Sequence, residues 1–215
     1  MAVIIAPSIL SADFAHLADE VKRVTDAGAE YIHIDVMDGA FVPQITIGAP
    51  VVKSLRKFSR AVFDVHLMIE NPEKQIDAFA TAGADIITFH IETAKHAHRI
   101  IQQIHSANCK AGVAINPATS LSAIEEILGD VEMVLIMTVN PGYGGQKFIP
   151  STLKKISRLK KIIDEQNLNC DIEVDGGINP ETSKLVSDAG ADILVAGSAV
   201  YGAENISAAI KLIRG

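Results

Sequence analysis

The sequence predicts an α/β fold in which residues 1–215 form one domain, a (β/α)8 TIM barrel. Two features lead to this prediction: short apolar runs alternate with stretches of helical periodicity along the chain, and a four-residue repeat marks the passage from helix to strand. Alternating strands and helices produce a parallel sheet covered by helices. A chain of 215 residues has room for eight strand–helix units of about 25 residues, close to the lower size limit of such barrels.

Short apolar runs that are rich in β-branched residues are expected to form the strands. The eight runs cover residues 3–9, 31–36, 62–67, 86–91, 111–115, 133–139, 171–175 and 192–196. Between them apolar residues recur with a period of about 3.6, which is typical of helices with one buried face. This pattern is clearest over 14–24 and 152–163.

The repeat Ala-Gly-Ala followed by an acidic residue occurs at 27–30, 82–85 and 189–192. In each copy the glycine stands where the end of a helix favours a left-handed residue. A repeat of this kind favours a closed barrel over the main alternative, a doubly wound open sheet. The open sheet usually has a glycine-rich first turn such as GxGxxG, and the first turn here, 6–10, contains no glycine.

Composition limits the classes of function. With 48% hydrophobic and 21% charged residues, the chain can bury one substantial core. Its net charge of -7 argues against nucleic acid or an anionic membrane as the main partner, because both require a basic face. The two cysteines have no CxxC spacing, so a disulfide framework and a thiolate zinc site are not expected, and a reduced, cytoplasmic setting is.

The apolar N-terminus, residues 1–10, is expected to contain the first strand. It has no basic leader, and it meets Pro7 and Asp13 too early for a signal peptide or a membrane span.

The second predicted strand carries polar groups on one face. Side chains alternate along a strand, so His33, Asp35 and Met37 point to the same side. A buried His–Asp hydrogen bond would be the simplest explanation of His33 and Asp35 taken alone. In a barrel, however, the carboxyl ends of the strands form the active-site rim, which makes the other strand ends informative.

Two other strand ends add ligand types at the same rim. The third predicted strand places His66 in the same phase as Asp35, and the seventh ends at Asp175. His33, Asp35, His66 and Asp175 therefore form a candidate site for Zn²⁺ or another divalent first-row ion. His90 and Glu92 follow the fourth strand in a similar phase and are either supporting groups or substitute ligands. The remaining histidines, at 16, 96, 98 and 105, fall in helical stretches and are expected to be solvated or packed.

The loops after the sixth, seventh and eighth strands are rich in glycine, which lets backbone N–H groups approach an anion. The candidate phosphate-binding residues are Gly142, Tyr143, Gly144, Gly145, Gly176, Gly177, Gly197 and Ser198. A short helix is expected to begin near Ser198 and to direct its positive end at the anion. The arrangement matches a TIM barrel of the phosphate-binding type, and the loop around 142–145 is a candidate lid.

Three methionines, Met37, Met68 and Met137, end strands at the same rim. Methionine usually fills gaps in a core. At this rim the three side chains are expected to form a water-excluding cavity wall.

Five motifs closely resemble those of the ribulose-phosphate 3-epimerase family, and the similarity extends over nearly the whole chain. They are HIDVMDG at 33–39, DVHLM at 64–68, NPGYGGQKF at 140–148, EVDGG at 173–177 and AGSAV at 196–200. The opening IAPSIL at 5–10 places the family's substrate-contacting serine at Ser8.

The resemblance implies interconversion of D-ribulose 5-phosphate and D-xylulose 5-phosphate through an enediolate. It implies one divalent metal ion per subunit, with Zn²⁺ expected and Fe, Mn or Co as alternatives, held by the four residues named above. Asp35 and Asp175 become the acid/base pair. Ser8, His66, the glycine loops and Asp175 become substrate contacts. Inverting C3 requires two bases that flank the carbon, which suits two carboxylates from non-adjacent strands.

Several alternatives remain open at this point. An epimerase for D-allulose 6-phosphate would use the same residues. A non-catalytic sugar-phosphate sensor would keep the glycine loops but would not need Asp35 or Asp175. A related decarboxylase would have a DxKxxD pattern, whereas His66 stands at the lysine position, and no strand ends in the lysine of a Schiff-base aldolase. A homo-oligomer is expected, since barrels with short helices often associate.

Overall fold

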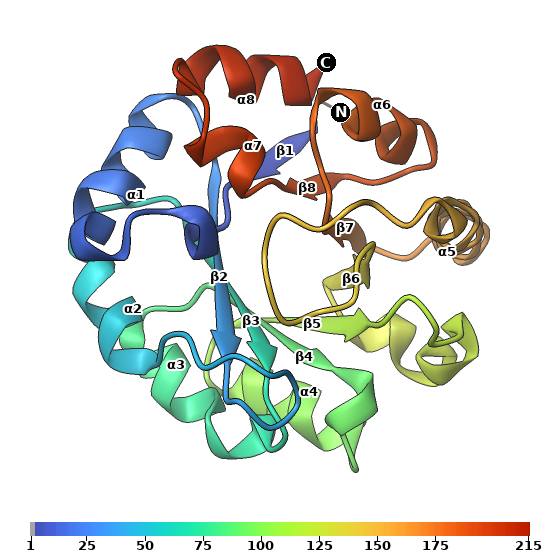
Figure 1. Cartoon of the computed structure of the whole chain (residues 1–215). Helices are drawn as coiled ribbons and strands as arrows, with labels where there is room; N and C mark the ends of the chain where they lie inside the picture. Colours follow the sequence, from blue (N-terminus) through green and yellow to red (C-terminus); the bar gives the residue numbers. More distant parts are fainter. Residues whose placement is uncertain (1–2) are drawn as a thin grey trace.

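Eight parallel strands are hydrogen-bonded side by side in the order β1-β8-β7-β6-β5-β4-β3-β2 (Figure 1). The computed structural model describes residues 3–215. The strands are β1 Ile4–Ala6, β2 Tyr31–Met37, β3 Val62–Met68, β4 Ile86–His90, β5 Lys110–Ile115, β6 Met133–Met137, β7 Asp171–Asp175 and β8 Ile193–Val195. Each overlaps one of the predicted apolar runs, so the predicted barrel is confirmed.

The barrel closes between β1 and β2, where the pairing is short. Ser8 and His33 form an isolated parallel bridge, and the backbone N–H of His33 donates to the carbonyl of Pro7 at 3.1 Å. On its other side β1 pairs with β8 over three residues. The last helix reinforces this seam, because Arg214 donates to the carboxylate of Glu30 and to the carbonyl of Gly28, 186 positions earlier.

Helices surround the strands in a ring (Figure 1). They are α1 Leu17–Asp26, α2 Ala49–Leu55, α3 Ile76–Ala82, α4 Ala97–Ser106, α5 Leu153–Gln166, α6 Pro180–Asp188, α7 Ser198–Tyr201 and α8 Ile206–Arg214. In α5 the buried residues Ile156, Leu159 and Ile163 follow the predicted periodicity. After β5 two 3₁₀ segments, η5 Leu121–Ala123 and η6 Glu125–Asp130, take the place of an α-helix.

The predicted helix over 14–24 begins later than the periodicity indicated. Residues Phe14–His16 form a 3₁₀ turn, and α1 starts at Leu17. The side chain of Asp13 accepts a hydrogen bond from the N–H of Ala15, so a capping interaction tightens this first turn.

The glycines of the repeat have the predicted left-handed backbone. Gly28, Gly83 and Gly190 have φ values of 101°, 103° and 109° at the ends of α1, α3 and α6. Each lets the chain reverse from a helix into the next strand.

The hydrophobic core is divided into one main cluster and three smaller ones. Outward-facing residues such as Ile32, Ile34 and Val36 pack beneath the helices in the main cluster. Inside the barrel, apolar residues at the start of the strands, among them Ile86, Met133 and Ile193, form a smaller cluster. Buried polar side chains, among them His33, Asp35 and His66, lie nearer the carboxyl end of the barrel, together with small apolar clusters that include Met37, Met68 and Met137.

Neither cysteine is in a disulfide: Cys109 and Cys170 are both buried free thiols. Among the helices of residues 3–215, none combines the length and the apolar character that crossing a bilayer would require.

Candidate active site

Four polar side chains converge inside the carboxyl end of the barrel. His33 and Asp35 come from β2, His66 from β3 and Asp175 from the end of β7. One ligand atom from each lies within 4.8 Å of the others. Strand alternation directs all four inward, and the register that pairs Asp35 with His66 sets them side by side. The structure thus brings together the four residues that the sequence singled out as metal ligands.

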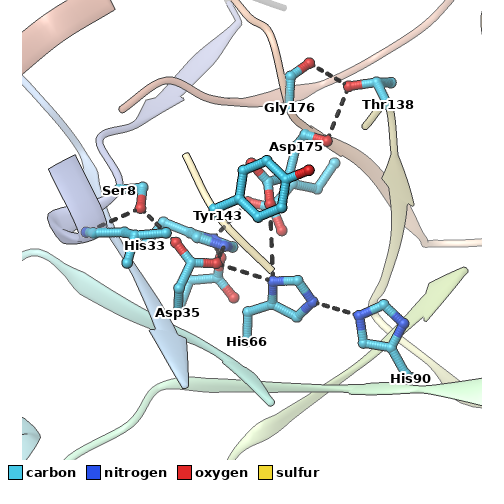
Figure 2. A network of polar contacts seen from close by, with 12 residues as sticks. Ser8, His33, Asp35, His66, His90, Thr138, Tyr143, Asp175 and Gly176 are labelled. Atoms are coloured by element: carbon cyan, nitrogen blue, oxygen red, sulfur yellow. Dashed lines mark hydrogen bonds and ion pairs between the residues drawn. The ribbon is translucent and has the colours of Figure 1, made fainter. Parts of the chain in front are cut away.

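The histidine nitrogens that face this cluster have no hydrogen-bond partner. His33 Nε2 and His66 Nδ1 are buried and unpaired within the described chain. They lie 3.4 Å and 3.3 Å from Oδ1 of Asp35, and His66 Nδ1 lies 3.9 Å from Oδ2 of Asp175 (Figure 2). Buried polar atoms are rarely left without a partner. Two orphaned imidazole nitrogens facing two carboxylates fit a divalent cation.

The other ring nitrogen of His33, Nδ1, contacts a buried carboxylate. His33 Nδ1 lies 2.5 Å from Oδ2 of Asp64, and Oε1 of Glu173 lies 3.8 Å from the same nitrogen. All three side chains are fully buried. Asp64 therefore accepts the Nδ1 proton of His33 and leaves Nε2 directed at the cluster.

The environment separates the pKa values of the two aspartates. Burial raises the pKa of Asp175 to about 7, and the charge of Asp35 adds to the shift. Burial also acts on Asp35, but the adjacent His33 and His66 outweigh it and hold the pKa of Asp35 far below its usual range. Two carboxyl groups with divergent pKa values are the pattern expected of an acid/base pair.

Hydrogen bonds fix both aspartates. The Ser8 hydroxyl donates to Oδ2 of Asp35 at 2.5 Å. At the end of β7, the N–H of Thr138 donates to the carbonyl of Asp175 at 2.7 Å, and Oγ1 of Thr138 lies 2.6 Å from the carbonyl of Gly176 (Figure 2). The backbone that carries Asp175 is therefore anchored to the end of β6.

A cavity of about 500 Å³ opens above the cluster. Asp35 and Asp175 reach it, whereas His33 and His66 are fully buried and lie outside its lining. Met37, Met68 and Met137 form part of its wall. A volume of this size suits a small-molecule ligand.

The three glycine loops meet at this cavity. Its lining includes Gly142 to Gly145 after β6, Gly176 and Gly177 after β7, and Gly197 and Ser198 at the start of α7. The loop after β6 extends over the end of the barrel (Figure 1), and the Tyr143 side chain on it is 54% exposed. A Cβ on Gly197 would lie 2.4 Å from Oγ of Ser11, and one on Gly177 would lie 2.5 Å from the backbone nitrogen of Phe148. Both sites therefore require glycine for close packing.

His90 and Glu92 lie behind His66 and outside the four-residue cluster. The other histidines, at 16, 96, 98 and 105, are exposed; three lie in helical segments, as expected, and His96 is in the turn just before α4.

Several residues of the site are not predicted by the sequence patterns above. Ser11, Asn179 and Thr182 line the cavity, and no sequence pattern marked these loop and helix-start positions. Glu173 is fully buried beneath the site. Strand alternation would have placed Glu173 on the same face as Asp175.

Comparison with known proteins relates this chain to a family. The model of the ribulose-phosphate 3 epimerase family matches residues 4–201. The chain is 55% identical to a ribulose-phosphate 3-epimerase of Bacillus subtilis (strain 168) over 98% of each chain. It is 54% identical to the chloroplastic ribulose-5-phosphate-3-epimerase of Arabidopsis thaliana, over 99% of this chain and 76% of that protein.

Solved structures show the same fold at low identity. A crystal structure of 3-hexulose-6-phosphate synthase superimposes with a TM-score of 0.68 at 20% identity, covering 100% of this chain and 98% of that one. Thiamine phosphate pyrophosphorylase from Pyrococcus furiosus gives a TM-score of 0.66 at 18% identity, covering 99% and 94% of the two chains. These likenesses support the barrel alone.

Proposed function

The chain belongs to the ribulose-phosphate 3-epimerase family and is an isomerase, and from this premise we propose how it acts. Its reaction is the inversion of C3 in a ketopentose phosphate, which interconverts D-ribulose 5-phosphate and D-xylulose 5-phosphate. The main support is the cluster of His33, Asp35, His66 and Asp175 directly beneath a glycine-lined cavity.

The reaction uses the two aspartates as acid and base. One carboxylate removes the proton from C3, and the electrons of the C–H bond form the C2–C3 double bond of an enediolate while the C2 oxygen takes up negative charge. The other carboxyl group then returns a proton to the opposite face of C3, which restores the carbonyl at C2. In the metal-free site the pKa of Asp35 lies far below that of Asp175, so Asp175 is the group of the pair that more readily holds a proton.

His33, Asp35, His66 and Asp175 would hold one divalent metal ion, with Zn²⁺ the best match to a site of two imidazoles and two carboxylates. A bound cation would supply positive charge that offsets the negative charge developing on the sugar's oxygen atoms. Asp64 and Ser8 orient His33 and Asp35 for that purpose.

The glycine loops would bind the phosphate group through backbone N–H groups. The loop over 142–145 would close on the bound sugar and exclude water. Met37, Met68 and Met137 would keep the reacting end of the cavity dry.

Turnover of D-ribulose 5-phosphate with and without metal tests the proposal. Protein freed of metal by a chelator, and shown by elemental analysis to be free of it, is expected to lose activity and to regain it with Zn²⁺. Comparison with D-allulose 6-phosphate tests the preference for the five-carbon sugar. Full activity of the verified metal-free protein would contradict the metal site, and faster turnover of the six-carbon sugar would contradict the substrate.

A further inference from the structure

Behind His66 a chain of hydrogen bonds extends to the edge of the barrel. His66 Nε2 lies 2.8 Å from Nε2 of His90 (Figure 2), and His90 Nδ1 lies 3.0 Å from Oε2 of Glu92. Both imidazoles are fully buried. The aromatic ring of Phe41 packs against the imidazole of His90 at a centroid distance of 4.7 Å.

Glu92 is held rigidly at the outer end of this chain. Its second oxygen, Oε1, accepts a hydrogen bond from the N–H of Asn116 at 2.8 Å and another from the hydroxyl of Thr119. Lys155 fixes the same loop, since its Nζ atom donates to the carbonyls of Asn116, Pro117 and Thr119. Only 21% of the Glu92 side chain is exposed. The carboxylate therefore has a defined orientation, with Oε2 directed at His90.

Within this series of hydrogen bonds, each group determines which ring nitrogen of the next histidine carries the proton. An ionised carboxylate only accepts hydrogen bonds, so His90 must carry its proton on Nδ1. A neutral imidazole then has an acceptor at Nε2, which requires a proton on Nε2 of His66. His66 Nδ1 is left without a proton, and this is the orphaned nitrogen that faces Asp35 and Asp175.

We propose that Glu92, acting through His90, is a positioning residue that keeps Nδ1 of His66 free to bind a metal ion. The inference rests on the proposed metal site. His33 has a simpler version of the same arrangement, because its Nδ1 meets Asp64 directly and its Nε2 faces the cluster. For His66 the corresponding carboxylate is that of Glu92, and the imidazole of His90 lies between the two.

Glu92→Gln tests this assignment because it keeps the shape of the side chain while making one end a donor. Two donors, the N–H of Asn116 and the hydroxyl of Thr119, face one end of the group, so the amide oxygen will turn toward them and the NH₂ toward His90. That orientation reverses the direction of both hydrogen bonds. His90 then accepts at Nδ1 and donates from Nε2, and His66 carries its proton on Nδ1. The nitrogen needed for the metal is then protonated.

Two measurements detect this change in the tautomer of His66 and its effect on metal binding. Two-bond ¹H–¹⁵N correlation spectra of metal-free protein labelled with [¹⁵N]histidine, assigned with single-histidine variants, distinguish the two neutral tautomers. The parent is expected to show His66 protonated on Nε2, and Glu92→Gln to show it protonated on Nδ1. The affinity for Zn²⁺, measured by competition with a chromophoric chelator, is expected to fall by about 10- to 100-fold, the usual cost of losing a partner of a ligating histidine.

Glu132→Gln is the matched control. Oε2 of Glu132 also accepts from a histidine, His105 Nε2 at 3.1 Å, and from a backbone N–H, that of Ala111 at 2.8 Å. Glu132 precedes β6, at the opposite end of the barrel. This variant loses comparable contacts and is expected to leave both the tautomer of His66 and the affinity for Zn²⁺ unchanged.

The outcomes separate this inference from the proposed function. A parent protein that does not bind Zn²⁺ contradicts the proposed metal site, whatever the tautomers are. A parent that binds Zn²⁺, with His66 protonated on Nδ1 or His90 present as an imidazolium, overturns the role of Glu92 even if the variant fails to fold. An unchanged tautomer and an affinity for Zn²⁺ within about twofold of the parent in Glu92→Gln, well below the expected loss, overturn it as well.

Discussion

The Oγ atom of Ser8 lies 2.5 Å from Oδ2 of Asp35, which joins the loop after β1 to a carboxylate on β2. The hydroxyl donates this hydrogen bond to a buried anion, and the same Oγ accepts from the N–H of Leu10 at 3.2 Å. One side chain therefore caps the 3₁₀ turn η1 Ile9–Ser11 and holds Asp35 in place.

Ser8→Ala is expected to lower kcat for D-ribulose 5-phosphate by about 10- to 100-fold, because a hydrogen bond to a charged group contributes about 1.5–3 kcal/mol. Ser120→Ala is a suitable control. Ser120 likewise caps a 3₁₀ turn, accepting from the N–H of Ser122 at 3.3 Å, but it lies outside the cavity lining. Equal losses in the two variants would mean that Ser8 acts only as a cap.

Asp35→Asn and Asp175→Asn are each expected to reduce turnover by at least ~10², since each deletes one acid/base group. Asp192→Asn, which alters a side-chain contact to the N–H of Ile172 at the other end of the barrel, should retain activity. Isotope tracing tests the pairing more directly. In heavy water, xylulose 5-phosphate from a single turnover should carry solvent deuterium at C3. Retention of the original hydrogen would indicate a single shuttling base.

Metal binding is expected to depend on pH through Asp175. Burial raises its pKa to about 7, so below that pH the metal-free protein holds a proton that Zn²⁺ must displace. The affinity for Zn²⁺ should therefore increase as the pH rises toward about 7. The number of protons released on binding should fall by up to about one between pH 6 and pH 8.

Calorimetric titration in buffers of different ionisation enthalpy measures this release. Asp175→Asn removes the titrating group and should abolish the fall that it contributes. A constant number of released protons in the parent would show that Asp175 is already ionised before the metal binds.

Gly197→Ala is expected to raise the KM for the sugar phosphate by about 10-fold, equivalent to about 1.4 kcal/mol of lost binding, with a smaller effect on kcat. A Cβ there would lie 2.4 Å from Oγ of Ser11, so the cavity wall must shift where phosphate is expected. Gly129→Ala, where a Cβ would meet nothing within 4 Å, is the control. If Gly197→Ala bound inorganic phosphate as tightly as the parent does, this loop would have no role in phosphate binding.

Gly112→Ala is expected to destabilise the barrel by about 1–3 kcal/mol through overpacking. The new Cβ would lie 2.2 Å from Oγ1 of Thr88, which is buried on the neighbouring strand. Adding Thr88→Ala removes that atom and should restore much of the stability. Urea denaturation of the single and double variants measures both effects, and a single variant as stable as the parent would contradict the clash.

Strand alternation accounts for the parts of the site that could be predicted from sequence. On β2 and β3 the two-residue period sets the directions of His33, Asp35 and His66, and the barrel brings Asp175 to the same rim. Loop glycines could likewise be assigned to the cavity, because the loops after parallel strands share one end of a barrel.

The role of Glu92 could not be predicted in this way, because it depends on contacts between segments that are far apart in the sequence. Glu92 lies in the 3₁₀ turn η4 Ile91–Thr93, beyond the end of β4, where alternation no longer fixes the direction of a side chain. Its contacts with Asn116 and Thr119 join segments 24 and 27 residues apart. The sequence therefore leaves open whether Glu92 is a ligand or a supporting group, and its contacts with the loop after β5 make it a supporting group.

The short seam between β1 and β2 has a consequence for the order in which the molecule is assembled on the ribosome. β1 is synthesised early, but the strand with which it shares a ladder, β8, follows only after the six others. The contact of Arg214 with Gly28 spans 186 positions, and contacts between such distant segments form late because their loop-closure entropy is large. The three-residue ladder that anchors β1, the strand before Ser8, is therefore complete only when β8 is available. A nascent chain that ends before β8 contains Ser8 and all four proposed metal ligands, yet it lacks the strand that pairs with β1.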